Sequence, residues 1–360
     1  MGHTRETRGK TMKKVLFATS ALVLSAGFAS AEVAVSGDGR MGVIYDGNDA
    51  QFSSRARVKF TLTGESDSGL SFGGAFRVDQ ENYNANEFRS AARGTAGAVW
   101  ISGTYGKLSM GDTVSAAEAA IGDLAEVGYT DGEFGGDVEE LFFLTGDGVN
   151  TDQGPNILYE YTINNISLFA SASDGSDNDR CGISGNVISG ADDVCGEPGD
   201  IDYDGDADSD VAYSLAAKYE GSNFWASLSY SKHGDASEIG LGAEGSFNNF
   251  SVKGVYLHYE DNDGFEIETA PGGGSTVFVA ATLEKTYGLS MAYQMDAILV
   301  EGFYRRDELE SLTGTADADF DSFGIGVEYD LGGGAVLAGG IIDTDYLDDT
   351  VVDAGIKFSF

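Results

Sequence analysis

The sequence is poor in prolines, cysteines and cations. Its 360 residues include 3 prolines, 2 cysteines and 21 Lys and Arg against 59 Asp and Glu. The net charge of −38 excludes nucleic acid as a partner, because phosphate contacts need clustered cations. No apolar run of about 18 residues follows residue 31, so no membrane-spanning helix is expected there. No nucleophile motif is present, so no enzyme is predicted.

The first 31 residues have the pattern of an export leader. The basic pair Lys13-Lys14 precedes an apolar run at 15–28, and Ala29-Ser30-Ala31 is a small-residue cleavage site. The polar stretch before Met12 fits no signal, so we expect translation to start at Met12. Residues 1–31 are then removed, and residues 32–360 form one domain.

The end of the chain alternates strictly between apolar and polar residues. Side chains in a strand point alternately to opposite faces, so one face of 351–360 is apolar and the other is polar. About ten residues suffice for a tilted strand to cross a bilayer. A chain that ends on such a strand, with a terminal Phe360, is typical of a bacterial outer-membrane β-barrel.

The alternating pattern recurs along the whole chain, at about 20 residues per strand plus loop, which predicts ~16 strands. Gly is abundant, with 52 residues, as expected where turns are tight and backbones pack closely. Short turns are expected near 65–69, 106–107, 164–165, 221–222, 248–249 and 332–334. Long acidic connections are expected near 79–95, 112–153, 174–209, 260–275 and 306–319. The fold class is therefore all-β, a 16-stranded antiparallel transmembrane barrel; a soluble secreted β-protein is the alternative.

Some strands do not reveal their faces. At 250–259, 297–306 and 335–342 both alternating sets contain apolar residues, so the pattern does not say which set points outward.

Cations gather on the polar face of the first three predicted strands. Packed side by side they repel one another unless water and counter-charges separate them, and a water-filled lumen offers both. The sequence therefore predicts a basic strip on a pore wall, with a solvated sheet face as the alternative. The strip comprises Arg40, Arg55, Arg57, Lys59 and Arg77.

The longest connection carries the opposite charge. No Lys or Arg occurs between Leu108 and Asp179, while ten acids lie between Asp112 and Asp147. The segment also contains an Ala-rich helical turn at 115–121 and an apolar patch at 142–144 that needs burial. We expect this third loop to fold into the lumen, with its apolar residues on the wall and its carboxylates facing the cations. Because the loop acids outnumber the wall cations, a weak cation preference is expected.

Two further features lie in one predicted outer loop, at 174–210. Cys181 and Cys195 predict a disulfide after export, with two free thiols as the alternative. The acids that follow match the first part of a calcium-binding EF-hand loop, but Val211 stands where the bidentate Glu belongs. A weak calcium site and a solvated acidic loop are both open, and no other cofactor is required. These acids are Asp200, Asp202, Asp204, Asp206 and Asp208.

Several segments resemble the trimeric general porins of purple-bacterial (alphaproteobacterial) outer membranes. They are S-G-D-G-R-M-G-V at 36–43, S-S-R-A-R-V at 53–58, D-S-G-L-S-F-G at 67–73, G-D-L-A-E-V-G-Y-T-D at 122–131, D-L-G-G-G-A at 330–335 and K-F-S-F at 357–360. The resemblance covers the chain from residue 32 to the end, except for the Cys-bearing loop.

The resemblance implies a homotrimer in the outer membrane, in contact with lipid and lipopolysaccharide. It implies passive diffusion of ions and small hydrophilic solutes past an inward-folded third loop. It places the basic wall at the five cations named above and the facing carboxylates at Glu118, Asp123, Glu126 and Asp131. A substrate-specific outer-membrane channel is the alternative function.

Overall fold

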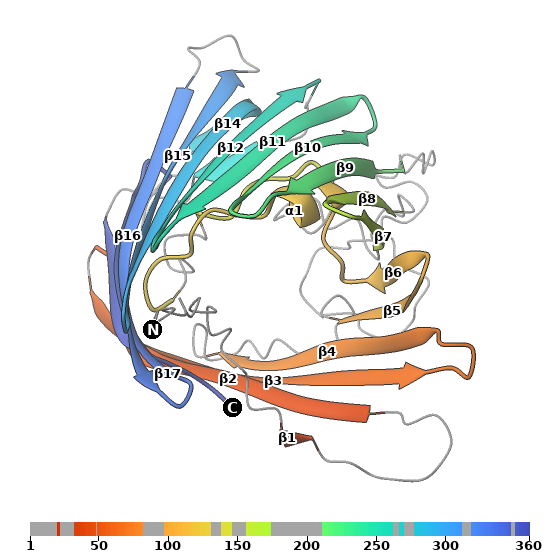
Figure 1. Ribbon diagram of the computed structural model, residues 1–360. Helices are drawn as coiled ribbons and strands as arrows, with labels where there is room; N and C mark the ends of the chain where they lie inside the picture. The colour runs from red at the N-terminus through yellow and green to blue at the C-terminus, as the bar shows by residue number, and fades with distance from the viewer. Residues whose placement is uncertain are drawn as a thin grey trace, which may run out of the picture.

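A computed structural model shows a closed antiparallel β-barrel (Figure 1). It describes residues 20–21, 32–47, 49–81, 97–130, 138–145, 156–173, 211–261, 266–269, 277–311, 318–346 and 350–360. Within these residues sixteen strands form the barrel wall, as predicted, and each pairs with the next along the chain. β1 (Ser20–Ala21) and β13 (Glu266–Thr269) are short additions that pair with β2 and β14.

The wall strands vary widely in length. Their bounds are β2 (Glu32–Tyr45), β3 (Ala50–Glu65), β4 (Ser71–Glu81), β5 (Gly97–Gly103), β6 (Gly106–Gly111), β7 (Asn156–Ile163), β8 (Ile166–Ser173), β9 (Tyr213–Glu220), β10 (Phe224–His233), β11 (Ala236–Phe247), β12 (Phe250–Glu260), β14 (Val277–Met295), β15 (Ile298–Ser311), β16 (Ala318–Gly332), β17 (Ala335–Thr344) and β18 (Val351–Ser359). The single helix among the described residues is α1 (Ala116–Ile121).

The first and last wall strands close the barrel. β18 pairs antiparallel with β2 from Val352 opposite Tyr45 to Ser359 opposite Asp38. Two backbone hydrogen bonds between Gly37 and Phe360, of 2.7 and 2.9 Å, extend this seam to the last residue. Because an open barrel edge in lipid would leave backbone groups without partners, the sequence predicts antiparallel pairing of residues 33–43 with 351–360. This pairing is confirmed in partner and direction. Its β2 side is 37–45 rather than 33–43, because residues 33–36 reach beyond the end of β18.

Alternation along the strands places apolar side chains on the outside. Val43 on β2 and Phe52 on β3 are 41% and 86% exposed in the isolated barrel. Ile44, the residue after Val43, is 1% exposed and faces inward. The strands with undetermined faces have apolar residues on both sides because the inward loop covers part of the inner wall. On β12, Val255 and Leu257 point inward and are buried under the loop.

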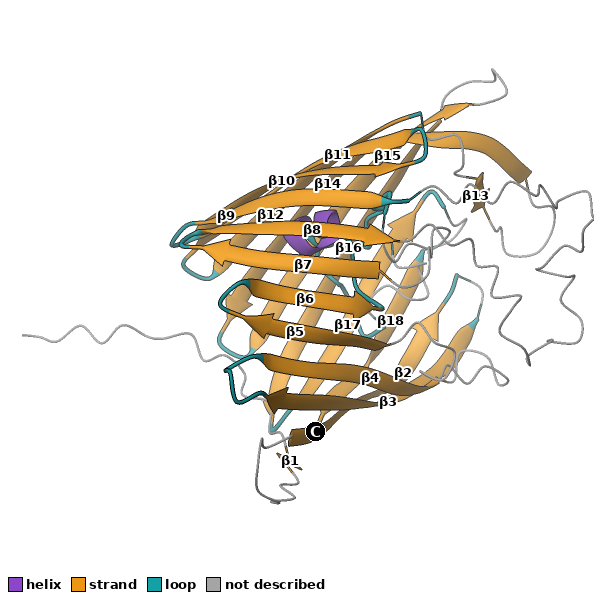
Figure 2. Ribbon diagram, turned by 90° about the vertical axis from the view of Figure 1, so that its right-hand side faces the viewer, coloured by secondary structure: helices purple, strands orange, loops and turns teal. Residues whose placement is uncertain are grey.

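Most of the predicted tight turns lie where expected. Figure 2 shows them gathered at one end of the barrel. The turn expected at 106–107 lies at 104–105, and the long connection expected at 306–319 is shorter because β15 extends to Ser311 and β16 starts at Ala318. β10 and β11 are joined by only two residues at the other end, a short connection that the sequence reading missed.

The connection between β6 and β7 folds into the barrel, as expected. Its first part contains α1, which lies inside the wall formed by β8–β11 (Figures 1 and 2). Ser115 caps the helix by accepting a hydrogen bond from the Glu118 N–H.

The loop is attached to the wall by hydrogen bonds and by apolar packing. The N–H groups of Ala116 and Ala117 donate to wall hydroxyls on Ser171 and Ser214, at 2.9 and 3.1 Å. The buried hydrophobic cluster therefore lies between loop and wall, around Ile121, Leu124, Val127, Leu257 and Phe303.

No helix in the described part of the chain is long and apolar enough to cross a bilayer.

Candidate functional site: a constriction inside the barrel

The five predicted cations lie on the inner face of β2, β3 and β4: Arg40, Arg55, Arg57, Lys59 and Arg77. Strand register places Arg40 directly opposite Arg55, and Lys59 opposite Arg77. Like charges in such cross-strand pairs repel one another. The Asp38 carboxylate, 3.7 Å from the Arg55 guanidinium, supplies one counter-charge on the same face.

These cations differ in their exposure. Lys59 and Arg77 are exposed, and Arg57 is half-buried. Arg40 is 4% exposed, and its Nη1 donates to the Thr130 carbonyl of the inward loop at 2.8 Å. Arg40 therefore lies beneath the loop rather than on the open lumen wall, a position that strand alternation alone does not reveal.

The loop lies against the wall along a row of inward-facing glycines. A methyl group at Gly326 would come within 2.8 Å of the Gly128 nitrogen, and one at Gly340 within 2.7 Å of the Gly128 Cα. Side chains at these wall positions would push the loop toward the lumen. The same row contacts Leu124, Val127 and Tyr129 of the loop, and its members are Gly288, Gly324, Gly326, Gly340 and Gly355.

The described part of the loop has two limbs, an outgoing limb that ends at residue 130 and a return limb at 138–145. The two limbs are hydrogen-bonded to each other. The Leu124 N–H donates to the Glu139 carbonyl at 3.1 Å, and the Leu141 N–H donates to Asp123 Oδ1 at 2.9 Å. Burial raises the pKa of the Asp123 carboxyl above its usual 3.8, and the Leu141 N–H only partly opposes this effect. Asp123, predicted as a pore-facing carboxylate, thus also holds the two limbs together.

The return limb is fixed by buried charged groups on the wall. Arg305 donates to the carbonyls of Val138 and Glu140, at 3.2 and 2.6 Å, and pairs with Asp307 at 2.8 Å. Glu238 accepts the Leu144 N–H at 2.6 Å. Sequence reasoning missed these anchors. Arg305 lies on a strand whose faces were undetermined, and Asp307 lies in the segment expected to be a long connection, which in the structure is still β15. Glu238 is a single acid with no charged neighbour in the strand pattern to mark it.

The remaining predicted carboxylates are placed only in part. Glu126 is exposed, and Glu118 is half-buried on α1. Asp131, the cysteines Cys181 and Cys195, and the acids Asp200, Asp202, Asp204, Asp206 and Asp208 lie outside the described residues. Within the described part of the chain, no group of His, Cys, Asp and Glu is placed to hold a metal ion.

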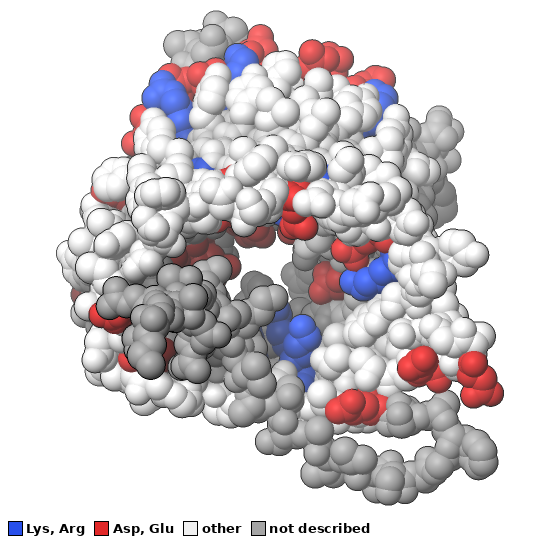
Figure 3. All heavy atoms as spheres, viewed as in Figure 1, with Lys and Arg blue, Asp and Glu red and all other residues white. Residues whose placement is uncertain are grey.

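The space-filling view shows an opening through the middle of the barrel (Figure 3). Lys and Arg side chains gather at its lower edge, over β2–β4, and Asp and Glu side chains lie along its upper edge, on the side of the loop. Opposite charges therefore face each other across a narrowed passage, an arrangement that produces a transverse field on passing ions.

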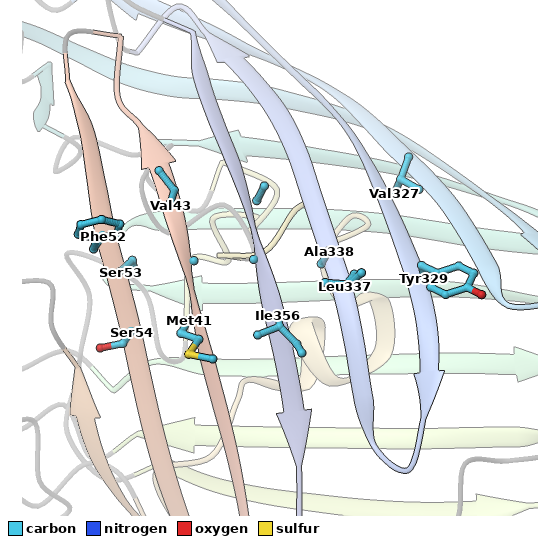
Figure 4. Close-up of a pocket in the computed structure, with 13 residues that line it drawn as sticks. Met41, Val43, Phe52, Ser53, Ser54, Val327, Tyr329, Leu337, Ala338 and Ile356 are labelled. Atoms are coloured by element: carbon cyan, nitrogen blue, oxygen red, sulfur yellow. The ribbon is translucent and has the colours of Figure 1, made fainter.

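A second hollow lies outside the barrel. It is an open hollow of about 920 Å³ over β2, β3 and β16–β18, and Figure 4 shows the apolar side chains that line it, including Met41, Val43, Phe52 and Tyr329. Because these side chains are on the outer face, the hollow is not part of the passage.

Comparison with known proteins agrees with this geometry. Residues 18–349 match the family of Gram-negative porins. A porin from Rhodobacter capsulatus is 36% identical over 342 residues, which cover 91% of this chain and all of the relative. A porin from Fuscovulum blasticum is 26% identical with the same coverage.

Solved structures show the same fold. A porin refined at 1.8 Å resolution superposes with a TM-score of 0.66 at 34% identity, covering 91% of this chain and all of that one. A variant of Rh. blastica porin gives a TM-score of 0.59 at 20% identity, again over 91% of this chain and all of the other. The closed sixteen-stranded barrel, its inward loop and the match along nearly the whole sequence establish that the chain belongs to the Gram-negative porin family.

Proposed function

We propose that this porin is a general diffusion channel of the outer membrane, which passes ions and small hydrophilic solutes without catalysis. The observation that supports the proposal is the inward loop, which narrows a charged lumen without filling it. A water-filled passage lined by opposite charges admits small polar solutes and excludes larger ones.

The charges around the passage favour a weak cation preference. On the wall, Arg40 is covered by the loop and Arg55 is near Asp38, which leaves Arg57, Lys59 and Arg77 as the more exposed cations. The inward loop is rich in acids and contains no cation. The net field at the passage is therefore expected to be negative.

Liposome swelling with neutral sugars of graded size tests the general function. Swelling rates that fall smoothly with sugar size support a general porin. Saturable uptake of one solute would instead support the alternative, a substrate-specific channel, and no swelling with any sugar would contradict both.

Reversal potentials in a planar bilayer test the transverse field. Replacing Arg55 and Arg57 together with Gln should raise cation preference, and Glu126→Gln should lower it. Arg306→Gln is the matched control, because Arg306 pairs with Asp319 and Asp321 on the outer face of β15 and β16. An anion-selective wild type, or variants that do not differ from the control, would contradict this picture.

We further propose that the protein assembles as a homotrimer. β5 and β6 contain only 7 and 6 residues, about 24 and 20 Å at ~3.4 Å per residue. The hydrocarbon core of a bilayer is about 30 Å thick. Neighbouring copies would cover this low part of the wall, and the rest of the outer face would contact lipid and lipopolysaccharide. Native mass spectrometry of the detergent-extracted protein that finds only monomers would contradict the proposal.

The leader and the outer loop complete the proposal. Residues 1–31 are removed on export, so the N-terminal sequence of the membrane form should begin at Glu32. Cys181 and Cys195 form a disulfide, and a titration that finds two reactive thiols would rule it out. A weak calcium site at Asp200–Asp208 would appear as calcium binding that is lost when these acids are replaced.

A further inference from the structure

The tip of the inward loop, residues 128–130, is bound to the last strand of the barrel through one carboxylate. Asp353 on β18 is 7% exposed. Its Oδ1 accepts the Tyr129 N–H at 2.9 Å, and its Oδ2 accepts the Thr130 N–H at 2.7 Å and the Thr130 hydroxyl. Oδ1 also accepts the Gly340 N–H of β17 at 2.9 Å. Three donors from the tip, together with one from β17, converge on this buried carboxylate, and hydrogen bonds to a charged acceptor make a strong, directional attachment.

The same tip is bound to the first two wall strands. Arg40 on β2 donates to the Thr130 carbonyl at 2.8 Å, and its guanidinium lies 5.8 Å from the centre of the Tyr129 ring. The Tyr129 hydroxyl donates to the Ser53 carbonyl on β3 at 2.8 Å. Because β18 and β2 are the strands that close the barrel, the tip bridges the closure seam.

The local sequence is suited to this attachment. Gly128 has a φ of +88°, and a methyl group on it would lie 2.5 Å from Asp353 Oδ1. Glycine at 128 therefore lets the carboxylate reach the next two N–H groups. Tyr129 fills the space above Gly355, where a Cβ would come within 2.5 Å of the ring.

We propose that Asp353, Thr130 and Arg40 form a latch that holds the loop tip across the closure seam and thereby sets the size limit of the channel. Asp353 is a positioning residue, since it acts through the loop. The inference rests on the proposed diffusion function. In this proposal two kinds of contact fix the position of the loop: its hydrophobic packing on the wall and its hydrogen-bonded attachment at the seam.

The test compares variants that break the latch with near-identical ones that keep it. Asp353→Asn keeps the shape of the side chain but replaces one of its two acceptor oxygens with an amide NH₂, which is a donor. The hydrogen bonds that this oxygen accepts, either from Thr130 or from Tyr129 and Gly340, are then lost. Thr130→Val removes one hydroxyl donor, and Thr130→Ser restores it. Asp330→Asn is the control, because Asp330 accepts a backbone N–H from Gly332 in the turn between β16 and β17 instead of binding the loop.

Two measurements report on the latch separately. The first is the ratio of liposome swelling rates for a large and a small neutral sugar, which does not depend on the amount of folded protein. The second is hydrogen exchange at the amides of Tyr129 and Thr130, which does not depend on transport. Loss of a hydrogen bond to a charged group should increase exchange about tenfold.

Asp353→Asn and Thr130→Val should raise both the sugar ratio and the exchange rate, while Thr130→Ser and Asp330→Asn should match the wild type. A wild-type sugar ratio in folded Asp353→Asn and Thr130→Val proteins would overturn the latch. Slower swelling for all sugars at an unchanged ratio would overturn it too, because that result indicates less folded protein only. If wild-type protein passes no sugar but exchange still rises, the attachment stands and the diffusion function fails.

Discussion

At the scale of single residues, glycines on the inner wall allow the loop to pack closely against it. The glycines at 288, 324, 326, 340 and 355 sit where a Cβ would collide with loop atoms at 2.5 to 2.8 Å. Their role is therefore close approach rather than a special backbone conformation. The loop can lie low on the wall, and the lumen beside it stays open.

Gly326→Ala should narrow the channel. The added methyl would lie 2.8 Å from the Gly128 nitrogen, so the loop must move toward the lumen or the barrel must accept strain of about 1–3 kcal/mol. Single-channel conductance should fall. Gly254→Ala is the control, because a Cβ at Gly254 would meet nothing within 4 Å. Equal conductance of the two variants would show that the loop is not held at this contact.

Asp123 should make loop docking sensitive to pH. Burial raises the pKa of its carboxyl above 3.8, so the docked state binds this proton more tightly than the unfolded chain does. Protonated Asp123 therefore stabilises the docked loop at low pH. This stabilisation is lost as pH rises from 3.8 through the raised pKa of the docked state. The protection of the Leu124 amide, measured as its hydrogen exchange relative to the intrinsic rate at each pH, should therefore increase on acidification in the wild type. In Asp123→Asn this part of the pH dependence should disappear, and an identical profile in both proteins would argue against it.

At the scale of secondary-structure elements, the seam between β18 and β2 is distinctive because it joins the two ends of the chain. An unpaired strand edge in lipid would leave backbone groups without hydrogen-bond partners. Gly37 and Phe360 exchange two backbone hydrogen bonds at the very end of the seam. The Phe360 ring also covers Gly37, where a Cβ would lie 2.7 Å from it.

Deleting Phe360 should impair assembly. The deletion removes both bonds to Gly37, each worth about 0.5–1.5 kcal/mol, together with the ring contact. The fraction of protein that shows a heat-modifiable gel shift should fall. Phe360→Ala keeps the backbone bonds and should assemble better than the deletion. Normal assembly of the deletion would mean that the seam does not need its last residue.

At the scale of the whole molecule, charge is distributed unevenly. The chain carries a net charge of −38, yet its wall cations lie side by side on β2–β4. The negative field of the loop acids and acidic connections therefore opposes the positive field of one basic strip. Selectivity follows from the difference between these two fields, which explains why only a weak preference is expected.

Raising the salt concentration should remove most of the cation preference. The screening length falls from about 10 Å at 0.1 M to ~3 Å at 1 M, so charges across the lumen act less on a passing ion. Reversal potentials measured with the same salt ratio at both concentrations would check this. A preference that is undiminished at 1 M would point to selection by direct contact instead of by the field.

Much of the fold follows from the sequence, because the two-residue period of a strand is a local property. Outward apolar and inward polar residues alternate, so the strands, their direction and the position of Arg55, Arg57, Lys59 and Arg77 on the inner face are readable without a structure. The acidic composition and apolar patch of the third loop likewise predict that it folds inward.

Tertiary structure decided where that loop rests, because its seat is made by strands far apart in the sequence. Alternation places Asp353 and Arg40 on the inner face, but it does not predict that both contact Thr130, which lies 223 positions from Asp353 and 90 from Arg40. Where the loop packs, as on Leu257 of β12, the inner face becomes apolar and the alternation signal disappears. The sequence by itself thus determines the barrel and its charges, and only the packed structure determines which of those charges line the passage and which hold the loop.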